Sequence, residues 1–451
     1  MTQKFVVSNV GKLFERFLLQ KIKAHIQQNE ILKDTQTGFR SFHSTNHALA
    51  LVSDFVTDNL NKRNATIAVS LDLEKAFDTT WHEGIIYKMY KVFNFDTNIC
   101  RILNDYLKER SFYVEHGDEN SMLTDICAGV PQGSILAPYL FNIFLADLPQ
   151  PTQSDLMQNA KMLSLSYADD ILILASHQHI KKANKALNKY IEELTKYFSR
   201  WRLKLNPNKC ECTVFKGILK YLYPNARKYT PHIQIENNIV INKQQIKYLG
   251  VVLQEKFTFK LHFDYILKKA KNVFFAYSNL IKRAKDLKSN IKINIYKQII
   301  RPILGYAFPC WFNVSSAQME RLRVFERYIL RICSGLNRQT FNSNLTFRKR
   351  ISNKKIYNKC KIKRIDCFLI ENGLRFLSNL PYVENNLINE YYNKQHEISF
   401  PFSERYLSPI YLRQIQNQNL LYRDKKLLFY HRRYNTYNIE NLVYNTDQFV
   451  K

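Results

Sequence analysis

Residues 162–175 read Met-Leu-Ser-Leu-Ser-Tyr-Ala-Asp-Asp-Ile-Leu-Ile-Leu-Ala, two short apolar runs on either side of the tetrad Tyr167-Ala168-Asp169-Asp170. Each run is long enough for a buried strand, and the small tetrad between them indicates the tip of a β-hairpin. Adjacent carboxylates at such a tip repel each other, and loss of water raises the cost of keeping either ionised. A bound divalent cation removes that cost, because hard oxygen ligands suit Mg²⁺ and Mn²⁺. An ordinary acidic turn also explains the pair, so the choice between these two interpretations depends on the other motifs of the chain.

The composition favours a folded protein with a polyanionic partner. The chain has 451 residues, so two or three structural units are expected, and its hydrophobic fraction of 45% is that of a folded protein. Lys and Arg number 67 against 38 Asp and Glu, a net charge of +29 that points to nucleic acid. An anionic membrane surface is the competing partner, but no apolar stretch of about 20 residues is present to span a bilayer.

The eight cysteines are scattered along the chain, and no Cys-x-x-Cys pair is matched by a second pair, so a zinc knuckle is not supported. Thiols without a disulfide framework predict a reducing, intracellular location. The N-terminal residues mix charged and apolar side chains, which is not the pattern of a secretory signal.

Apolar periodicity predicts an α+β unit over the first 255 residues, with helices on one face of a small antiparallel sheet. Helices are expected at 5–28, 45–60, 83–92, 134–148 and 180–200. Strands are expected at 66–71, 162–165, 171–175, 211–215 and within 246–253. The apolar side of the first helix carries Val6, Val10, Leu13, Phe14, Phe17, Leu18 and Ile22.

Asp72 ends the predicted strand 66–71, about a hundred residues before Asp169. If the two strands are neighbours in one sheet, their carboxylates converge at one edge. Two metal ions held about 3.5–4 Å apart by such carboxylates can stabilise both sides of an in-line phosphoryl displacement. Taken alone, Asp72 is better explained as the N-cap of the helix that follows it.

The chain becomes more basic beyond about residue 255. The span 256–301 contains twelve Lys or Arg and two acids, and its apolar positions between 263 and 281 fit one helical face. Another face of the same predicted helix carries Lys268, Lys271, Lys282 and Lys285. A lysine stripe is usually a solvated face, but beside a site for nucleic-acid chemistry a helix that tracks phosphates becomes the better interpretation.

Six segments resemble motifs of one enzyme family in order and spacing. Leu71–Asp78, Gly129–Ser134 and Tyr167–Asp170 resemble motifs A, B and C of reverse transcriptases, and Leu205–Lys209 and Lys247–Val251 resemble motifs D and E. Gln36–Arg40, followed by His43-Ser44-Thr45, resembles the finger motif of non-long-terminal-repeat (LINE-type) retrotransposon enzymes, the jockey-like group above all. The resemblance covers about residues 8–255, with weaker similarity to about residue 336.

The resemblance implies a right-hand polymerase with an antiparallel palm sheet. Residues 1–255 would form fingers and palm, 256–340 a basic helical thumb-like region, and 341–451 a mostly helical basic extension of unknown role. The implied activity is RNA-directed DNA polymerase, which extends a DNA primer 3′-hydroxyl with dNTPs on an RNA template, using two Mg²⁺ ions or Mn²⁺.

The resemblance also implies features of the retrotransposon that would encode this chain. Elements of this group carry an endonuclease and a separate nucleic-acid-binding protein, which are therefore expected partners, and their integration takes place in the nucleus. Because the chain begins inside the first finger block, an N-terminally truncated reading frame is expected.

At matching positions the resemblance implies a role for each residue. Asp72, Asp169 and Asp170 would hold the metal ions, and Lys209 would protonate the pyrophosphate leaving group as a general acid. Phe77 would be a steric gate against the ribose 2′-hydroxyl. Further contacts with the incoming nucleotide would come from Arg40, Gln132, Gly133 and Tyr167. Nucleic acid would be held by Tyr248, Leu249 and Gly250 and by the four lysines of the basic helix.

Each role has a plainer alternative. Phe77 could be a core aromatic, Gln132 part of a Gly-rich turn, and Lys209 a solvated loop lysine. Arg40 could be an ordinary surface arginine, and Tyr248–Val251 a buried hairpin.

Other polymerases and an inactive protein are the alternatives for the whole chain. A viral RNA-dependent RNA polymerase would select for the 2′-hydroxyl that Phe77 is placed to reject. A group II intron maturase or a telomerase would share the palm, but the segment from Gly38 to Thr45 favours the retrotransposon group. The remaining alternative is a catalytically inactive remnant that only binds nucleic acid.

Overall fold

The computed structural model describes residues 9–108, 110–117, 119–131, 133–151, 160–217, 222–278, 281, 287–336, 339–340, 349–397, 407–410 and 412. Contacts within the chain divide it into two compact units. The first unit holds residues 1–257 together with 382–390, and the second holds 258–381 and 391–451. The predicted functional residues other than the four lysines of the basic helix all belong to the first unit.

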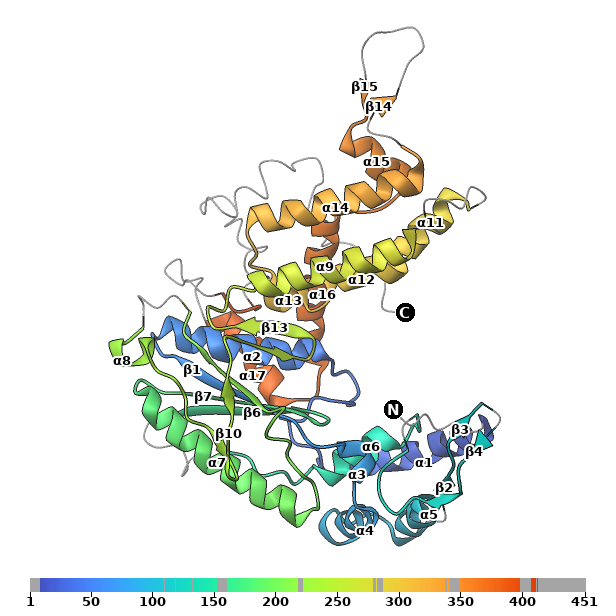
Figure 1. Ribbon diagram of the computed structural model, residues 1–451, viewed down its shortest axis with the longest axis vertical. Helices are drawn as coiled ribbons and strands as arrows, with labels where there is room; N and C mark the ends of the chain where they lie inside the picture. The colour runs from blue at the N-terminus through green and yellow to red at the C-terminus, as the bar shows by residue number, and fades with distance from the viewer. Residues whose placement is uncertain are drawn as a thin grey trace. The chain divides into compact units, whose positions relative to one another are not determined.

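The first unit is built on a five-stranded sheet with the order β11-β8-β1-β7-β6 (Figure 1). The strands are β1 (Thr66–Leu71), β6 (Lys161–Tyr167), β7 (Asp170–Ser176), β8 (Glu211–Phe215) and β11 (Ile241–Asn242). β1 pairs antiparallel with both β7 and β8, and β6 pairs antiparallel with β7. These four strands lie where the apolar runs predicted them.

The prediction of a purely antiparallel sheet was wrong, because β11 pairs parallel with β8. A parallel neighbour needs a connection long enough to carry the chain back to its starting end. The connection from β8 to β11 meets that need, since it contains α8 (Pro224–Arg227) and the hairpin of β9 (Gln234–Ile235) and β10 (Asn238–Ile239). The sheet is therefore mixed.

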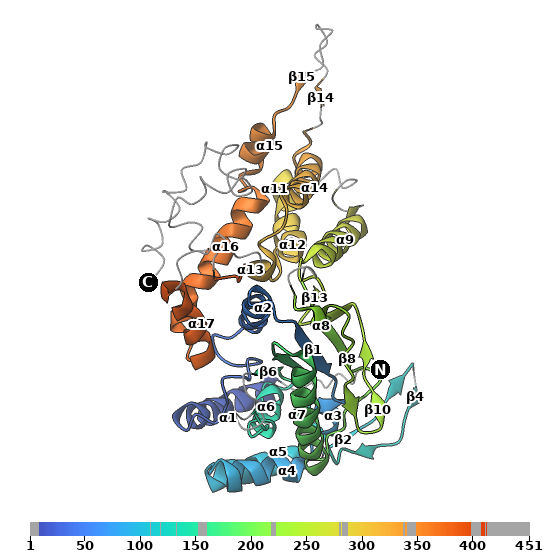
Figure 2. The same ribbon diagram turned by 90° about the vertical axis from the view of Figure 1, so that its left-hand side faces the viewer.

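Helices cover both faces of this sheet, which corrects the prediction of helices on one face. Figures 1 and 2 show α2 (Thr45–Asn61) on one side and α7 (Ile180–Arg200) on the other. The two central strands β1 and β7 are buried almost end to end. Continuous apolar runs of this kind need cover on both sides, whereas a half-exposed strand would alternate apolar and polar residues.

The helix α1 (Asn9–Gln28) buries a different side from the one that its apolar residues indicated. The exposed residues of the predicted apolar side are Val10, Leu13, Phe14 and Phe17, with 50% to 79% of their surface accessible. Leu18 and Ile22 are buried, and so is the carboxylate residue Glu15. The buried stripe therefore follows the partners available to the helix rather than its most apolar side.

The remaining elements of the first unit are short. Between β1 and β6 lie α3 (Ala76–Thr79), α4 (His82–Tyr87), the π-helix η1 (Lys88–Val92), α5 (Thr97–Leu107), β2 (Ser111–Phe112), β3 (Glu115–His116), β4 (Glu119–Asn120), β5 (Thr124–Asp125) and α6 (Ala137–Phe144). The helix expected at 134–148 is thus shorter at both ends. β12 (Gln245–Tyr248) and β13 (Val251–Gln254) form a hairpin of their own.

The second unit is helical where the structure describes it, apart from one small hairpin. Its elements, with the helices that join it to the first unit, are α9 (Lys260–Ala276), α11 (Ser289–Ile295), η3 (Tyr296–Ile300), α12 (Arg301–Gly305), α13 (Phe308–Trp311), α14 (Ser316–Ser334), β14 (Gln339–Thr340), β15 (Lys349–Arg350), α15 (Asn353–Cys360), α16 (Ile365–Asn379), η4 (Leu380–Tyr382) and α17 (Asn386–Glu397). The described part of the chain contains no helix long and apolar enough to cross a membrane.

Candidate active site

The sheet places the three predicted metal-binding carboxylates at one edge. β1 and β7 are antiparallel neighbours, and Leu71, the last residue of β1, is the partner of Ile171. Asp72 follows Leu71 directly, and Asp169 and Asp170 precede Ile171 on the adjacent strand. Residues about a hundred positions apart in the sequence therefore meet because the two strands run in opposite directions.

The turn between β6 and β7 holds the Asp pair in a constrained backbone. Tyr167 pairs with Asp170, which leaves Ala168 and Asp169 as a two-residue turn. Ala168 has φ of 56° and is 3% exposed. A left-handed backbone at a residue other than glycine costs of order 1 kcal/mol or more, and it persists only where the surrounding structure enforces it.

The electrostatics of the three carboxylates favour a bound cation. Desolvation raises the pKa of Asp169, and the carboxylate of Asp72 raises it further. Desolvation also raises the pKa of Asp170, with additional contributions from Asp169 and Asp72. Oδ2 of Asp72 is buried and has no hydrogen-bond partner within the described structure. A hard divalent cation would supply that oxygen with a ligand bond and relieve the mutual repulsion.

The carboxylates fit a metal that arrives with its substrate rather than a closed protein cage. The described ranges contain no group of three His, Cys, Asp or Glu side chains gathered closely enough to hold an ion by themselves. Magnesium in phosphoryl-transfer sites is bound by one or two carboxylates together with substrate phosphates and water. The strand end with Asp72, Asp169 and Asp170 offers the one or two carboxylates that such a ligand set needs.

The loop with Lys209 runs alongside Asp72. The backbone N–H of Asn206 donates to the carbonyl of Asp72 over 2.9 Å, and that of Glu74 donates to the carbonyl of Lys204 over 2.8 Å. These bonds bring Nζ of Lys209 to 3.9 Å from Oδ2 of Asp72, with the lysine side chain 67% exposed. The exposed ammonium group of Lys209 therefore lies beside the carboxylate of Asp72.

Phe77 and the Gly-rich loop are held against each other. The ring of Phe77 is partly buried and stacks on Phe141, with centroids 4.5 Å apart. Val130 N–H donates to the carbonyl of Phe77 over 2.7 Å, and Gly129 has φ of 94°. A Cβ at Gly129 would lie 2.6 Å from the carbonyl oxygen of Asp78, so this close approach requires glycine. Gly133 is exposed, and Gln132 lies outside the described residues.

A carboxylate that sequence reasoning missed holds the far end of this loop. Glu15 in α1 accepts a hydrogen bond from the backbone of Ile135 over 2.7 Å. The hydroxyl of Tyr106 lies 2.7 Å from Oε1 of Glu15 and 2.8 Å from Oγ of Ser134. The spacing of Glu15 with Leu18 and Ile22 on one helical face was the available signal.

Arg40 is bound both to its own loop and to the backbone carbonyl of Glu384, over 3.5 Å. Its guanidinium donates to the carbonyl oxygens of Lys33 and Gln36 over 2.9 and 3.3 Å and lies 3.9 Å from the carboxylate of Asp34. Burial lowers the pKa of Arg40 from its ordinary value. A role in binding a triphosphate would require the side chain to exchange these partners.

Tyr248 is buried, whereas the turn beside it is partly exposed. Leu249 and Gly250 both have positive φ, 43° and 79°, as a two-residue hairpin turn requires. Tyr248 is 2% exposed, and burial, the carboxylate of Asp170 and Tyr167 all raise the pKa of its hydroxyl. Of the three residues predicted here to hold nucleic acid, Leu249 and Gly250 are partly exposed and Tyr248 is buried.

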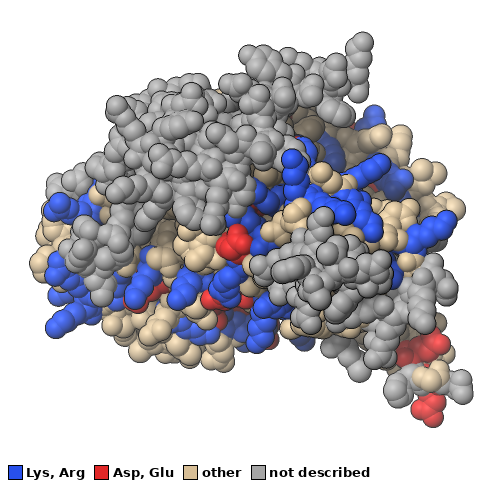
Figure 3. Space-filling view, turned by 90° about the horizontal axis from the view of Figure 1, so that it is seen from above, with Lys and Arg blue, Asp and Glu red and all other residues tan. Residues whose placement is uncertain are grey.

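The predicted basic helix is present only in part, as α9, which ends at Ala276; Tyr277 of the predicted apolar face caps it and is 40% exposed. Its predicted apolar face is buried at Phe263, Ile266, Leu267, Ala270 and Phe274. Lys268 and Lys271 are exposed on another face, and Lys282 and Lys285 lie outside the described residues. On the side seen in Figure 3, Lys and Arg side chains are spread widely and acidic side chains appear in few places.

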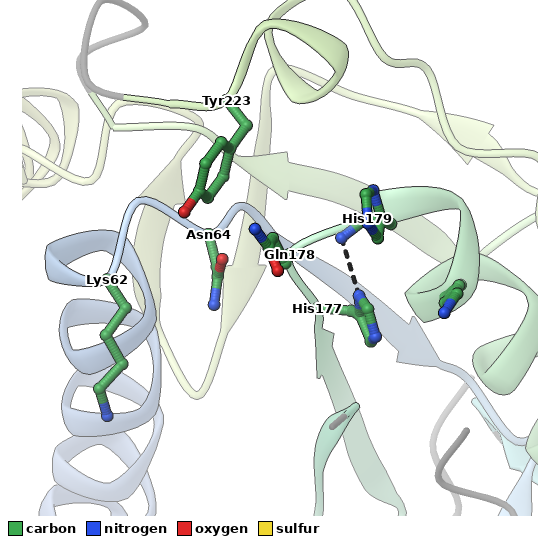
Figure 4. Close-up of a pocket in the computed structure, with 7 residues that line it drawn as sticks. Lys62, Asn64, His177, Gln178, His179 and Tyr223 are labelled. Atoms are coloured by element: carbon green, nitrogen blue, oxygen red, sulfur yellow. Dashed lines mark hydrogen bonds between the residues drawn. The ribbon is translucent and has the colours of Figure 1, made fainter. Parts of the chain in front are cut away.

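A polar pocket lies at the opposite end of β7 from Asp170 (Figure 4). Its lining residues are Lys62, Asn64, His177, Gln178, His179, Lys182 and Tyr223. The backbone N–H of His179 donates to Nδ1 of His177 over 2.7 Å. Because β7 separates the two places by its full length, this pocket is not part of the carboxylate site.

Known proteins similar to this chain are reverse transcriptases of mobile elements. The RNA-directed DNA polymerase from mobile element jockey of Drosophila melanogaster is 28% identical over 330 residues, which cover 73% of this chain and 35% of the relative. The probable RNA-directed DNA polymerase from transposon BS of the same organism is 31% identical over 326 residues, 72% of this chain and 35% of the relative. The chain thus spans about a third of the length of these curated relatives. They confirm the resemblance to jockey-like enzymes.

A solved structure of telomerase from Candida tropicalis, in complex with a fragment of telomeric RNA, aligns with 11% identity and a TM-score of 0.39, covering 88% of this chain and 56% of that chain. At this sequence identity and TM-score, the alignment does not indicate a function. The family model described as "Reverse transcriptase (RNA-dependent DNA polymerase)" matches residues 4–253, more than half of the chain. The chain therefore belongs to the reverse transcriptase family.

Proposed function

We propose that this chain is an RNA-directed DNA polymerase of a non-long-terminal-repeat retrotransposon, which extends a DNA primer with dNTPs on an RNA template. The observation that carries the proposal is the meeting of Asp72 with Asp169 and Asp170 at the edge of neighbouring antiparallel strands. The loops around Gly129 and Lys209 converge on the same strand end, because both are hydrogen-bonded to the segment 72–80. Membership of the reverse transcriptase family supports this choice of chemistry.

In the proposed reaction the three aspartates hold two Mg²⁺ ions, or Mn²⁺. Bound there, the ions would activate the primer hydroxyl and neutralise charge on the leaving pyrophosphate. Lys209 donates a proton to the pyrophosphate, which its position 3.9 Å from Asp72 supports. Phe77, braced by Phe141, blocks a ribose 2′-hydroxyl. Arg40, Gln132, Gly133 and Tyr167 contact the nucleotide.

We also propose a division of the chain by role. The mixed sheet with α2 and α7 would be the palm, and residues 1–255 as a whole would be fingers and palm. Residues 256–340, with Lys268, Lys271, Lys282 and Lys285, would form a thumb-like region that tracks duplex phosphates. Residues 341–451 would be an extension. The proposed partners beyond template and primer are an endonuclease and a nucleic-acid-binding protein, at a nuclear integration step.

Primer extension by the purified chain tests the proposal. With an RNA template, a DNA primer, dNTPs and Mg²⁺, wild type should extend the primer, and Asp169→Ala should reduce extension to background. Asp58→Ala is a matched control, because Asp58 is an acid in the same unit that pairs with Lys62 and with Lys161, at the end of β6 away from the Asp pair. If wild type does not extend, or extends no better than Asp169→Ala, an inactive remnant that only binds nucleic acid replaces the proposal.

A further inference from the structure

The segment Thr35–Gly38 lies along the last residues of the strand that leads into the Asp pair. Thr37 N–H donates to the carbonyl of Ser166 over 2.9 Å, and Ser166 N–H donates to the carbonyl of Thr35 over 3.0 Å. β6 is the edge strand of the sheet, so this segment occupies backbone groups that would otherwise be open. The catalytic hairpin is therefore braced on its outer side by residues of the predicted finger motif.

Gly38 is in direct backbone contact with the turn itself. A Cβ built on Gly38 would lie 2.5 Å from the backbone nitrogen of Ala168 and 2.9 Å from the carbonyl carbon of Tyr167. The φ of Gly38 is not in the left-handed region, so glycine is needed here for space rather than for backbone conformation. The two backbones touch where Ala168 holds its own positive φ.

One buried side chain fixes the segment in that place. Asn142 in α6 is fully buried; its Oδ1 accepts from Nε2 of Gln36 over 2.8 Å, and its Nδ2 donates to the carbonyl of Gly38 over 2.7 Å. Gln36 is 5% exposed. A buried amide pair with its bonds satisfied rigidifies its surroundings, because water cannot replace a lost partner. α6 begins just after the Gly-rich loop, so Asn142 links that loop's helix to the turn.

We infer that Gln36 and Asn142 are positioning residues, which act through Gly38 and Ala168 to set Asp169 and Asp170 against Asp72. Reacting groups must be held within about 0.5 Å of their productive geometry. The strained turn cannot supply that precision alone, since the backbone of Ala168 persists only where its neighbours enforce it. The expected effect on catalysis rests on the proposed function. The expected effect on the rigidity of the turn does not depend on that function.

The test measures the turn and the reaction separately in Gln36→Ala, Asn142→Ala and the double variant. Hydrogen exchange of peptides within 162–172 should become about tenfold faster in each variant, because the turn opens more readily. The kcat of single-nucleotide extension should fall about 10- to 100-fold while KM for dNTP stays within about twofold, since misplacement affects the chemical step. The double variant should be no slower than Asn142→Ala, because the two residues act as one unit.

Asn184→Ala is the matched control. Asn184 in α7 is another buried asparagine whose side chain makes two hydrogen bonds; it accepts from the backbone N–H of His232 over 3.1 Å and donates to the carbonyl of the same residue over 3.0 Å. It should leave exchange at 162–172 and kcat unchanged. An equal effect in this control, or unchanged exchange and kcat in the Gln36 and Asn142 variants, overturns the inference.

Failure of the inference can be distinguished from failure of the proposed function and from failure of a variant to fold. If wild type fails to extend a primer, the proposed function falls, and exchange at 162–172 still decides whether the turn is braced. If Asn142→Ala does not fold, Gln36→Ala decides the question, because it removes the same amide pair from the less buried side. Exchange at wild-type rates in Gln36→Ala then overturns the inference.

Discussion

Replacing Gly38 by alanine tests, with a single methyl group, the contact between the segment at Gly38 and the turn that carries Asp169 and Asp170. The new Cβ would lie 2.5 Å from the backbone nitrogen of Ala168, whereas ordinary van der Waals contact begins at 3.4 Å. The two backbones must therefore separate by about 0.9 Å, the difference between these distances. Neither contacting atom is the end of a flexible side chain, so the shift falls on the turn or on the segment 36–38.

The expected loss follows from the size of that shift. A misplacement of about 1 Å in an active site costs about 100-fold in rate. A 100-fold loss corresponds to about 2.7 kcal/mol of activation free energy. We expect Gly38→Ala to lower kcat by about this factor and to lower the free energy of unfolding by about 1–3 kcal/mol through overpacking.

The assay is rapid-quench incorporation of one nucleotide at saturating dNTP, with urea unfolding to establish that the variant is folded. Gly84→Ala serves as the control, because its Cβ would lie 2.7 Å from the ring of Trp81, a clash of similar depth that involves no atom of the turn. This control should lose stability and keep its kcat. Wild-type kcat in Gly38→Ala, or an equal loss in both variants, would refute the reasoning.

Two further predictions concern sugar selection and pH. Phe77→Val should raise incorporation of ribonucleotides relative to deoxynucleotides about tenfold or more, because the partly exposed ring stacked on Phe141 is the proposed barrier; unchanged discrimination in competition assays would remove Phe77 from this role. Burial lowers the pKa of His262 in α9 from 6.5 to about 4. As pH falls, the unfolded chain therefore binds a proton at this residue before the folded chain does. The contribution of neutral His262 to the free energy of unfolding is therefore complete above pH 6.5 and is lost as pH falls toward 4. The loss amounts to about 2 kcal/mol between pH 7.5 and 5. Pulse-labelling hydrogen exchange of α9 peptides across a urea titration should show this loss in wild type and not in His262→Phe, and equal pH dependence in both would contradict it.

The short-range features of the first unit were predictable from the sequence. The apolar runs that became β1, β7 and β8 are long enough to be recognised as buried strands, and Asp72 and the Asp pair stand at their ends. The parallel pairing of β11 was not predictable, because two residues carry no periodicity and their partner lies 30 residues away. Helices on both faces could have been inferred from the unbroken apolar runs.

The burial of individual side chains was predicted less well. Val10 and Phe14 belong to the apolar side of α1 and are exposed, whereas Glu15 is buried because Tyr106 and the backbone of Ile135 satisfy its carboxylate. For Tyr248 the sequence left open both a contact with nucleic acid and a buried hairpin, and the structure buries its side chain. In each case the outcome depends on a partner from a distant segment, which periodicity along one helix or strand does not contain.

The sequence by itself determined the family of this chain and the chemistry proposed for it, because carboxylates, a Gly-rich loop and basic residues in one order are residue-level properties. Only the tertiary structure decided how the Asp169–Asp170 turn is held. Gln36 and Gly38 belong to the predicted finger motif, but Asn142 lies about a hundred residues further along the chain, and nothing local links an uncharged asparagine to that motif or to the turn. Their role arises from two hydrogen bonds and one backbone contact that exist only after the chain has folded.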